Sequence, residues 1–410
     1  MVAAAVAGSS LGCGRFDYES LAARDPRDGG TLDAGPDPRA DAGPVPRAFE
    51  QLHPSFSTTS PTFVPVPRSR VDLPPAPAGQ PWVVWISAAL GSTATVEVSA
   101  EARYLVDGVE RGYGGVQSTL PGSPGSFNHF VAVDTSGGPA TLELELRDAG
   151  GGETTIDQIR VVAFLAPPGA DVHYAEMNPP VEFEEVAFTT LHTLAFTPSR
   201  PGEYVLFGAV ATSESPSTGA DVDVRWVGPI GGTFPTVHRY LNVRQAWQTF
   251  VMVDLVVVPD TTPRTVDLQA FDRAPASVRA SHILAMRADA FRGVVGRLDE
   301  PEVAASSGAT VALTEIVVAG EPGARNVILQ SARVRTPCPE DTEAREARFE
   351  VGTAVVTSFA HVIDNCAYEP SYGAVTLTDV EAAVTARNVL APTMGQTVLG
   401  AVSYVYALRL

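Results

Sequence analysis

The side chains best suited to catalysis or metal binding are scattered along this 410-residue chain. The seven histidines never form a His-x-His or His-x₃-His pair, so their spacing predicts no metal site. All 28 cationic residues are arginine, which excludes a P-loop lysine, a Schiff-base lysine and a Ser-x-x-Lys nucleophile. We therefore expect no catalytic residue, no metal and no cofactor.

Three local patterns match reactive motifs, and each has a simpler explanation. The segment 8–12 fits Gly-x-Ser-x-Gly, but no expected strand precedes it and no expected helix follows it, as a nucleophile elbow requires. Asp221 and Asp223 share one face of an expected strand and could hold calcium, yet we expect a solvated outer face, which explains them better. The acidic run 182–185 could supply a glycosidase carboxylate pair, but a charged strand edge also explains it.

An Arg-aromatic dipeptide is the most repeated polar feature of the chain. The arginines and aromatic rings could stack sugars or bind anions. Alternation along a strand instead predicts that the ring enters the core and the arginine stays outside. The three copies are Arg103-Tyr104, Arg225-Trp226 and Arg348-Phe349.

These residues belong to a unit that is repeated three times, 122 residues apart. One apolar segment begins at Trp82, Tyr204 and Asn326 (204 − 82 = 326 − 204 = 122). A second, far from the first, shows the same offset at 161–163, 283–285 and 405–407. Two distant segments with one offset indicate that a whole domain was copied.

Each repeat contains seven or eight short apolar segments with turn residues between them and no helical periodicity, which predicts an all-β protein of antiparallel β-sandwiches. The entry through a turn such as Pro201-Gly202 and a final apolar strand that closes each repeat resemble the tumour-necrosis-factor-like and complement-globular-head domains. That resemblance implies jelly-roll repeats. An immunoglobulin-like sandwich stays open.

The repeats and the composition together predict five segments. Residues 1–13 form a signal and lipobox remnant, and 14–50 form a disordered linker rich in Asp, Gly, Pro and Ala. The three sandwiches span 51–167, 176–291 and 299–410.

The strand at Trp82 is apolar on both faces, which bears on how the repeats meet. We expect the face of Val83 and Trp85 to form the core of the first repeat, because it stays apolar or small in every copy. The opposite face, with Trp82, Val84 and Ile86, would then need another cover. Members of the resembled family trimerise through such faces, which implies an intramolecular pseudo-trimer. A string of independent domains is the alternative, which we favour slightly.

The N-terminus resembles the end of a bacterial lipoprotein signal peptide. An apolar stretch leads to a lipobox-like sequence, Ser10-Leu11-Gly12-Cys13. The resemblance implies that Cys13 is lipidated and becomes the mature N-terminus, and Gly14 favours the outer membrane. A plain alanine-rich disordered terminus is the alternative.

The remaining cysteines, Cys338 and Cys366, both lie in the third repeat. In an oxidising compartment we expect them to form one disulfide, and two buried free thiols are the alternative. A zinc site is not expected, because neither cysteine has a close Cys or His neighbour.

A net charge of −19 argues against nucleic acid and against direct binding to an anionic membrane surface. We expect a non-catalytic protein on the outer membrane or extracellular surface, attached only through its lipid, that works in adhesion or binds a ligand such as a glycan. The alternatives are a structural component of a phage-like fibre or surface appendage, with partner protein chains, and a jelly-roll glycan hydrolase.

Overall fold

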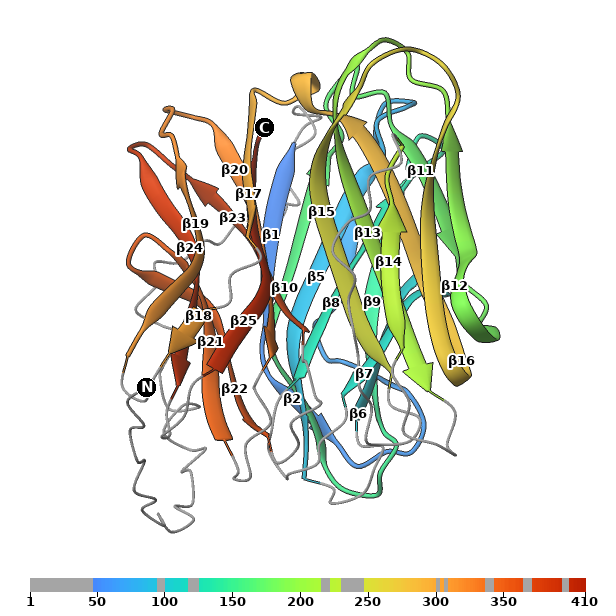
Figure 1. Ribbon diagram of the computed structural model, residues 1–410, viewed down its shortest axis with the longest axis vertical. Coiled ribbons are helices and arrows are strands. Elements are labelled where there is room, and N and C mark those ends of the chain that lie inside the picture. The colour runs from blue at the N-terminus through green and yellow to red at the C-terminus, as the bar shows by residue number, and fades with distance from the viewer. Residues whose placement is uncertain are drawn as a thin grey trace, which may run out of the picture. The chain divides into compact units, whose positions relative to one another are not determined.

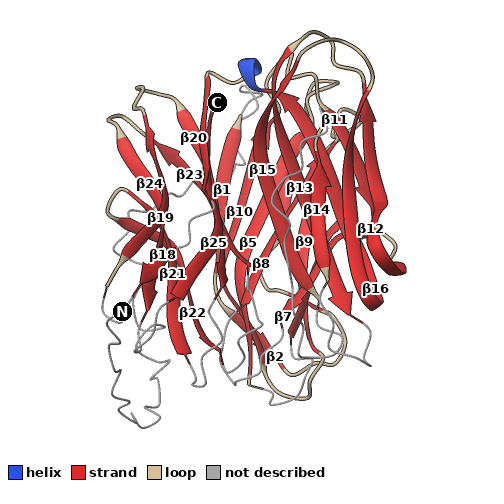
Figure 2. Cartoon of the chain, viewed as in Figure 1, coloured by secondary structure: helices blue, strands red, loops and turns tan. Residues whose placement is uncertain are grey.

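The computed structural model describes residues 47–93, 100–116, 125–214, 222–229, 247–299, 303–305, 309–335, 343–363, 371–392 and 398–410. Within these residues nearly all regular structure is β-strand, and one 3₁₀ turn, η2 (Ala288–Ala290), is the only helical element (Figure 2). The predicted all-β class is confirmed.

The first repeat forms two antiparallel sheets (Figure 1). Its strands are β1 (Ala48–His53), β2 (Phe56–Thr58), β3 (Val64–Pro65), β4 (Val71–Leu73), β5 (Trp82–Ser92), β6 (Ala100–Val106), β7 (Val109–Val116), β8 (Gly125–Val133), β9 (Ala140–Asp148) and β10 (Thr154–Leu165). One sheet has the order β1-β10-β5-β8, with β2 also beside β10. The other has the order β3-β9-β6-β7, with β4 also beside β9.

The second repeat differs because one strand belongs to both layers. Its strands are β11 (His173–Met177), β12 (Val181–Phe196), β13 (Gly202–Glu214), β14 (Asp223–Val227), β15 (Gln248–Val258) and β16 (Arg264–Arg287). The repeated apolar segment at 283–285 does not form a short strand of its own, because β16 is continuous over 24 residues. Its first part pairs with β14 and its second part with β11 and β13, so the order is β11-β16-β13-β15.

The third repeat again forms two sheets. Its strands are β17 (Gly293–Asp299), β18 (Val303–Ala305), β19 (Val311–Val318), β20 (Arg325–Arg335), β21 (Glu343–Val351), β22 (Ala354–Ile363), β23 (Ser371–Asp379), β24 (Val384–Pro392) and β25 (Val398–Arg409). The sheet orders are β17-β25-β20-β23 and β19-β24-β21-β22. We call β1-β10-β5-β8, β11-β16-β13-β15 and β17-β25-β20-β23 the inner sheets.

In each inner sheet the first and last long strands of the repeat are neighbours, as in a jelly roll, and the pairing keeps the 122-residue period. The equivalent pairs are Ile86–Val161, Gly208–Ile283 and Gln330–Val405. A bulge follows the same period, because Gln158 and Ala280 both have positive φ, 51° and 49°. The repeat therefore preserves the register of the strand pairing as well as the sequence pattern.

Burial separates the two kinds of sheet. In β9, Leu142, Leu144 and Leu146 are buried while the residues between them are partly exposed, as expected for a sheet with one wet face. In β8 all nine residues are buried, so both faces of that strand are covered. The inner sheet of the first repeat must therefore pack against something besides its own partner sheet.

The expected assignment of the two faces of β5 is wrong. Trp82, Val84 and Ile86 pack in the core of the first repeat with the leucines of β9. Val83 and Trp85 belong instead to a cluster with residues of the other two repeats. The alternation of side chains along β5 shows which residues share a face. Because both faces are apolar, it does not show which face packs in the core of the first repeat.

Candidate functional site

None of the residues singled out as lipidation or disulfide sites lies in the described part of the chain. Cys13, Cys338 and Cys366 all fall outside it, as do the segment 8–12 and Asp221. Lipidation at Cys13 and a Cys338–Cys366 disulfide therefore stay predictions. Asp223 is buried, not solvated as we expected. No group of three or more potential metal ligands occurs among the described residues.

The structural interpretation of the Arg-aromatic dipeptides is confirmed. Tyr104, Trp226 and Phe349 are each at most 1% exposed and lie in hydrophobic clusters. Arg103 is partly exposed and pairs with Glu145 at 2.5 Å. Arg348 likewise pairs with Glu346. Arg225 instead donates to the Gln269 side chain at 2.9 Å and lies over the Phe188 ring. The repeated arginines therefore have separate local partners and do not form a common site.

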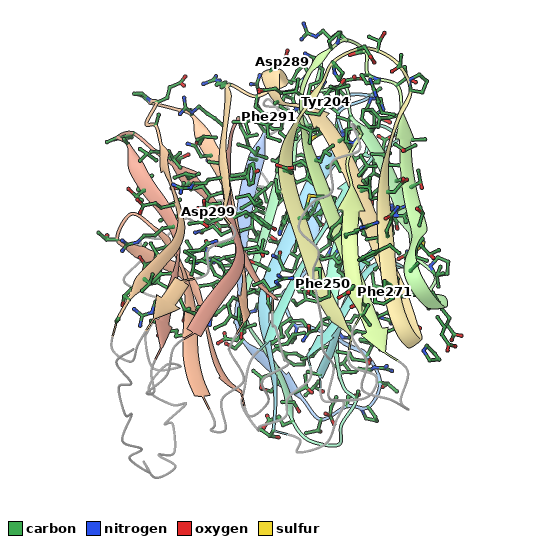
Figure 3. The ribbon with its side chains drawn as sticks, in the orientation of Figure 1. Tyr204, Phe250, Phe271, Asp289, Phe291 and Asp299 are labelled. Atoms are coloured by element: carbon green, nitrogen blue, oxygen red, sulfur yellow. The ribbon has the colours of Figure 1, made fainter. Side chains whose placement is uncertain are left out.

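The inner sheets of the three repeats contribute to one hydrophobic cluster, which we call the shared cluster and which also contains Phe291, labelled in Figure 3. Its members include Val83, Trp85 and Phe130 from the first repeat, Val205, Phe207 and Val253 from the second, and Val327, Leu329 and Val375 from the third. The Trp85 ring stacks on Phe130 (centroids 5.3 Å apart) and meets the edge of Phe207 (6.0 Å). This contact contradicts the expectation of independent domains.

The three copies fill the shared cluster with side chains of different sizes. Trp85, Phe207 and Leu329 occupy equivalent places, since they are 122 residues apart. The Asn128 side chain accepts a hydrogen bond from Trp85 Nε1 at 2.5 Å and fills the space beside Gly373. A Cβ atom on Gly373 would lie 1.6 Å from Asn128 Nδ2. A large residue in one repeat is thus matched by a small one in another.

Gly373→Ala should therefore destabilise the full chain by about 1–3 kcal/mol, because the added methyl group displaces the Asn128 amide. Urea unfolding of the variant measures this cost. Asn128→Ala removes the clash, so the double variant should be more stable than the sum of the single effects predicts. Strictly additive effects would mean that Asn128 and Gly373 do not meet.

One position of the repeat takes part in contacts between repeats in all three copies, directly in two of them and through Glu50 in the first. It is occupied by Arg160, His282 and Tyr404. Arg160 pairs with Glu50 at 2.7 Å, and this carboxylate also accepts from Thr376 of the third repeat at 3.3 Å. Tyr404 donates to the Val251 carbonyl of the second repeat at 3.1 Å. His282, the third residue at this position, contacts the Arg111 carbonyl of the first repeat.

His282 forms a reciprocal pair with His129 between the first and second repeats. His282 Nε2 donates to the Arg111 carbonyl at 2.6 Å, and His129 Nε2 donates to the Ala280 carbonyl at 2.8 Å. The two rings meet edge to face with centroids 4.8 Å apart. Burial lowers the pKa of His129 to about 4 and holds the pKa of His282 well below its usual range, so both rings are neutral at pH 7.

Polar groups on both sides complete this contact. Tyr104 Oη lies 3.0 Å from His129 Nδ1, and the Tyr174 hydroxyl contacts His282 Nδ1. Burial raises the pKa of both tyrosines well above the usual value, so they stay protonated and can donate. The Arg111 guanidinium pairs with Glu176 beside them. Every group here has a structural partner, which favours a role in joining repeats over a reaction centre.

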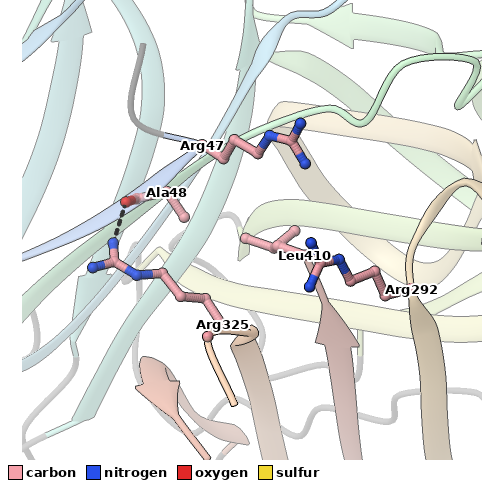
Figure 4. Close-up of a pocket in the computed structure, with 6 residues that line it drawn as sticks. Arg47, Ala48, Arg292, Arg325 and Leu410 are labelled. Atoms are coloured by element: carbon pink, nitrogen blue, oxygen red, sulfur yellow. Dashed lines mark hydrogen bonds between the residues drawn. The ribbon is translucent and has the colours of Figure 1, made fainter. Parts of the chain in front are cut away.

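Three surface hollows lie where repeats meet. One of about 560 Å³ lies between the first two repeats and is lined by apolar residues together with Asp107, Arg111 and Asp134. Two others, of about 330 and 390 Å³, share Arg47, Arg292 and Leu410. Figure 4 shows the smaller, with Arg47, Arg292 and Arg325 around Leu410. No sequence signal pointed to these arginines, because 278 residues separate the first from the last.

No family model and no curated protein matches the chain. Solved structures similar to it include the STIV MCP, at 10% identity over 58% of this chain and 95% of that one, with a TM-score of 0.20. Infectious bursal virus derived T=1 particles match at 8% identity over 88% and 79%, with a TM-score of 0.21. The CBM22-1-CBM22-2 tandem domain from Paenibacillus barcinonensis Xyn10C matches at 12% identity over 53% and 83%, with a TM-score of 0.19. At these TM-scores the similarities carry no argument about function.

Proposed function

We propose that this protein is an exported, lipid-anchored, non-catalytic surface protein that binds a ligand, such as a glycan, through an intramolecular pseudo-trimer of jelly-roll repeats. The observation that carries the proposal is the shared cluster, in which three inner sheets of one chain contact one another. A rigid unit of this kind supports binding sites at the joints between repeats, where ligand sites commonly form.

The proposed anchor rests on the sequence around Cys13 and on the linker that follows it. A proline-rich segment of about 35 residues could hold the sandwiches up to ~100 Å from a membrane. Among the described residues no helix is long and apolar enough to span a bilayer. A lipid on Cys13 is the attachment that the sequence supports.

Cys13→Ser should move the protein from the membrane fraction to a soluble fraction and abolish adhesion of the producing cells to ligand-coated beads. The reason is that the serine hydroxyl replaces the thiol to which the lipid would attach. The purified soluble variant should still bind the same ligand, since the sandwiches are unchanged. Unaltered fractionation would refute the anchor, and wild-type cells that bind no glycan or protein ligand would refute the binding function.

A further inference from the structure

The arginine-lined hollows between the first and third repeats have the features of an anion site. Arg47 directly precedes β1 of the first repeat, Arg292 precedes β17 and Arg325 begins β20 of the third. Their backbones are tied to the ends of the closing strands. At the end of β10, the Arg47 carbonyl accepts a hydrogen bond from Leu165 N at 2.8 Å. At the end of β25, Arg292 N donates to the Arg409 carbonyl at 2.9 Å. There too, the Arg325 carbonyl accepts a hydrogen bond from Leu410 N at 2.8 Å. These hydrogen bonds fix the backbones of three arginines from distant parts of the chain beside one another.

The charges of these arginines are only partly neutralised. Arg292 lies 3.5 Å from Glu321 and Arg325 lies 3.4 Å from Asp379, and both are exposed pairs of small energetic value. In the described part of the chain, the Arg47 guanidinium makes no hydrogen bond or ion pair, and no ion pair joins the Leu410 carboxylate to the three arginines. A protein with a net charge of −19 therefore keeps a local group of cations open to solvent.

The hollow between the first and second repeats provides an internal comparison. Pro81 lines it at the position equivalent to Arg325 (325 − 81 = 244, two repeat lengths). That hollow carries one arginine and two aspartates, whereas the smaller arginine-lined hollow carries three arginines and, besides the Leu410 carboxylate, no acidic group in its lining. A group of cations is therefore not a property of every joint.

The adjoining hollow offers a different surface. Its lining adds the apolar side chains of Leu165, Pro167 and Pro168, and the amide of Gln80. A guanidinium fork matches the geometry of a carboxylate or sulfate. An uncharged body of about one sugar ring could lie on the prolines while its acidic group meets the arginines.

We infer that this joint binds a ligand that carries a carboxylate or sulfate on a neutral body of about one sugar ring, such as a uronate unit. The inference rests on the proposed binding function and names the chemical class of its ligand. Arg47 and Arg292 hold the acidic group. Arg325 donates to the Ala48 carbonyl at 2.7 Å and so also ties the two repeats together.

Calorimetric titration of the full chain at low salt tests the site, with sodium glucuronate as the probe and glucose and sodium sulfate as comparisons. We expect saturable glucuronate binding, weaker sulfate binding and no glucose binding. Arg47→Gln and Arg292→Gln should each weaken glucuronate binding about tenfold. Arg70→Gln is the matched control, because Arg70 is an exposed arginine that does not line the hollow, and it should bind like the wild type.

Equal binding of glucose, no binding of glucuronate, or unchanged affinity in the Arg47 and Arg292 variants would each overturn the site. Failure of the proposed surface-binding function would give a different experimental result. If the wild-type chain bound no surface ligand at all, the binding function would fail. If surface binding persisted in an Arg47→Gln, Arg292→Gln double variant, only this site would be wrong.

Discussion

Trp85→Ala should destabilise the protein by about 3–5 kcal/mol and loosen all three repeats, although the substitution lies in the first. Trp85 is 1% exposed and packs in the shared cluster with residues of the second and third repeats. Removal of its ring leaves a cavity on which β13 and β20 also border. It also leaves Asn128 Oδ1 without the hydrogen bond from Trp85 Nε1.

The chain contains a matched control for this prediction. Trp82 is also buried, and its Nε1 also donates one hydrogen bond, to the Pro74 carbonyl at 2.9 Å, but its ring packs inside the first repeat. Trp82→Ala should cost a similar free energy of unfolding. The two variants differ in which cluster loses its tryptophan.

Hydrogen exchange by mass spectrometry separates the two variants. In Trp85→Ala the amides of β13 and β20 should exchange faster, whereas in Trp82→Ala the fastest added exchange should stay within β5, β6 and β9. Faster exchange confined to the first repeat in Trp85→Ala would show that the repeats do not depend on one another. That outcome would also remove the basis of the proposed pseudo-trimer.

The repeat and the fold class could be predicted because each strand carries its own pattern. A copied offset of 122 residues and short apolar segments do not depend on how distant parts meet. The direction of each face could not be predicted for β5, since Trp82 and Trp85 are equally apolar and lie on opposite faces. In β9 the alternation of leucines with polar residues shows which face is buried, because the polar face of that strand meets water.

The candidate ligand site could not be predicted for a related reason. Arg47, Arg292 and Arg325 line one hollow only because the end of β10, which binds Arg47, and the end of β25, which binds the other two, lie beside the same joint. In the sequence each is one arginine among 28. His129 and His282 likewise have no spacing relationship of the kind that marks a motif. Their pairing depends on how two sandwiches pack, which local periodicity does not encode.

The His129–His282 contact predicts that acid weakens the joint between the first two repeats. In the unfolded chain a histidine titrates near 6.5, but in the folded chain burial lowers the pKa of His129 to about 4. Between these values the unfolded chain binds more protons, so the free energy of unfolding falls as pH falls. His129 alone should account for about 3 kcal/mol between pH 7 and pH 4. His282 acts in the same direction, because its pKa is also lowered.

The described carboxylates with lowered pKa values do not produce this effect in the same window, and Asp254, whose pKa burial raises, acts in the opposite direction. Asp171 and Asp289 have pKa values below their usual range, so their contribution to stability is lost only as pH falls below about 4. A decline in stability from pH 6.5 to pH 4.5 therefore reports mainly on histidines. Two other described histidines have lowered pKa values. The pKa of His192, which contacts Ser281 within the second repeat at 2.8 Å, is about 4, and burial also lowers the pKa of His53 in the first repeat.

Urea unfolding at several pH values, combined with hydrogen exchange at pH 4.5, tests the prediction. A His129→Gln, His282→Gln double variant should lose most of the decline between pH 6.5 and pH 4.5, because glutamine keeps an N–H donor but does not titrate. In the wild type, exchange at pH 4.5 should rise first in β8 and in the second half of β16, the strands that carry the pair. His192→Gln should reduce the decline without changing which strands open first. If the double variant kept the full wild-type decline, protonation of the two rings could not be what weakens this joint.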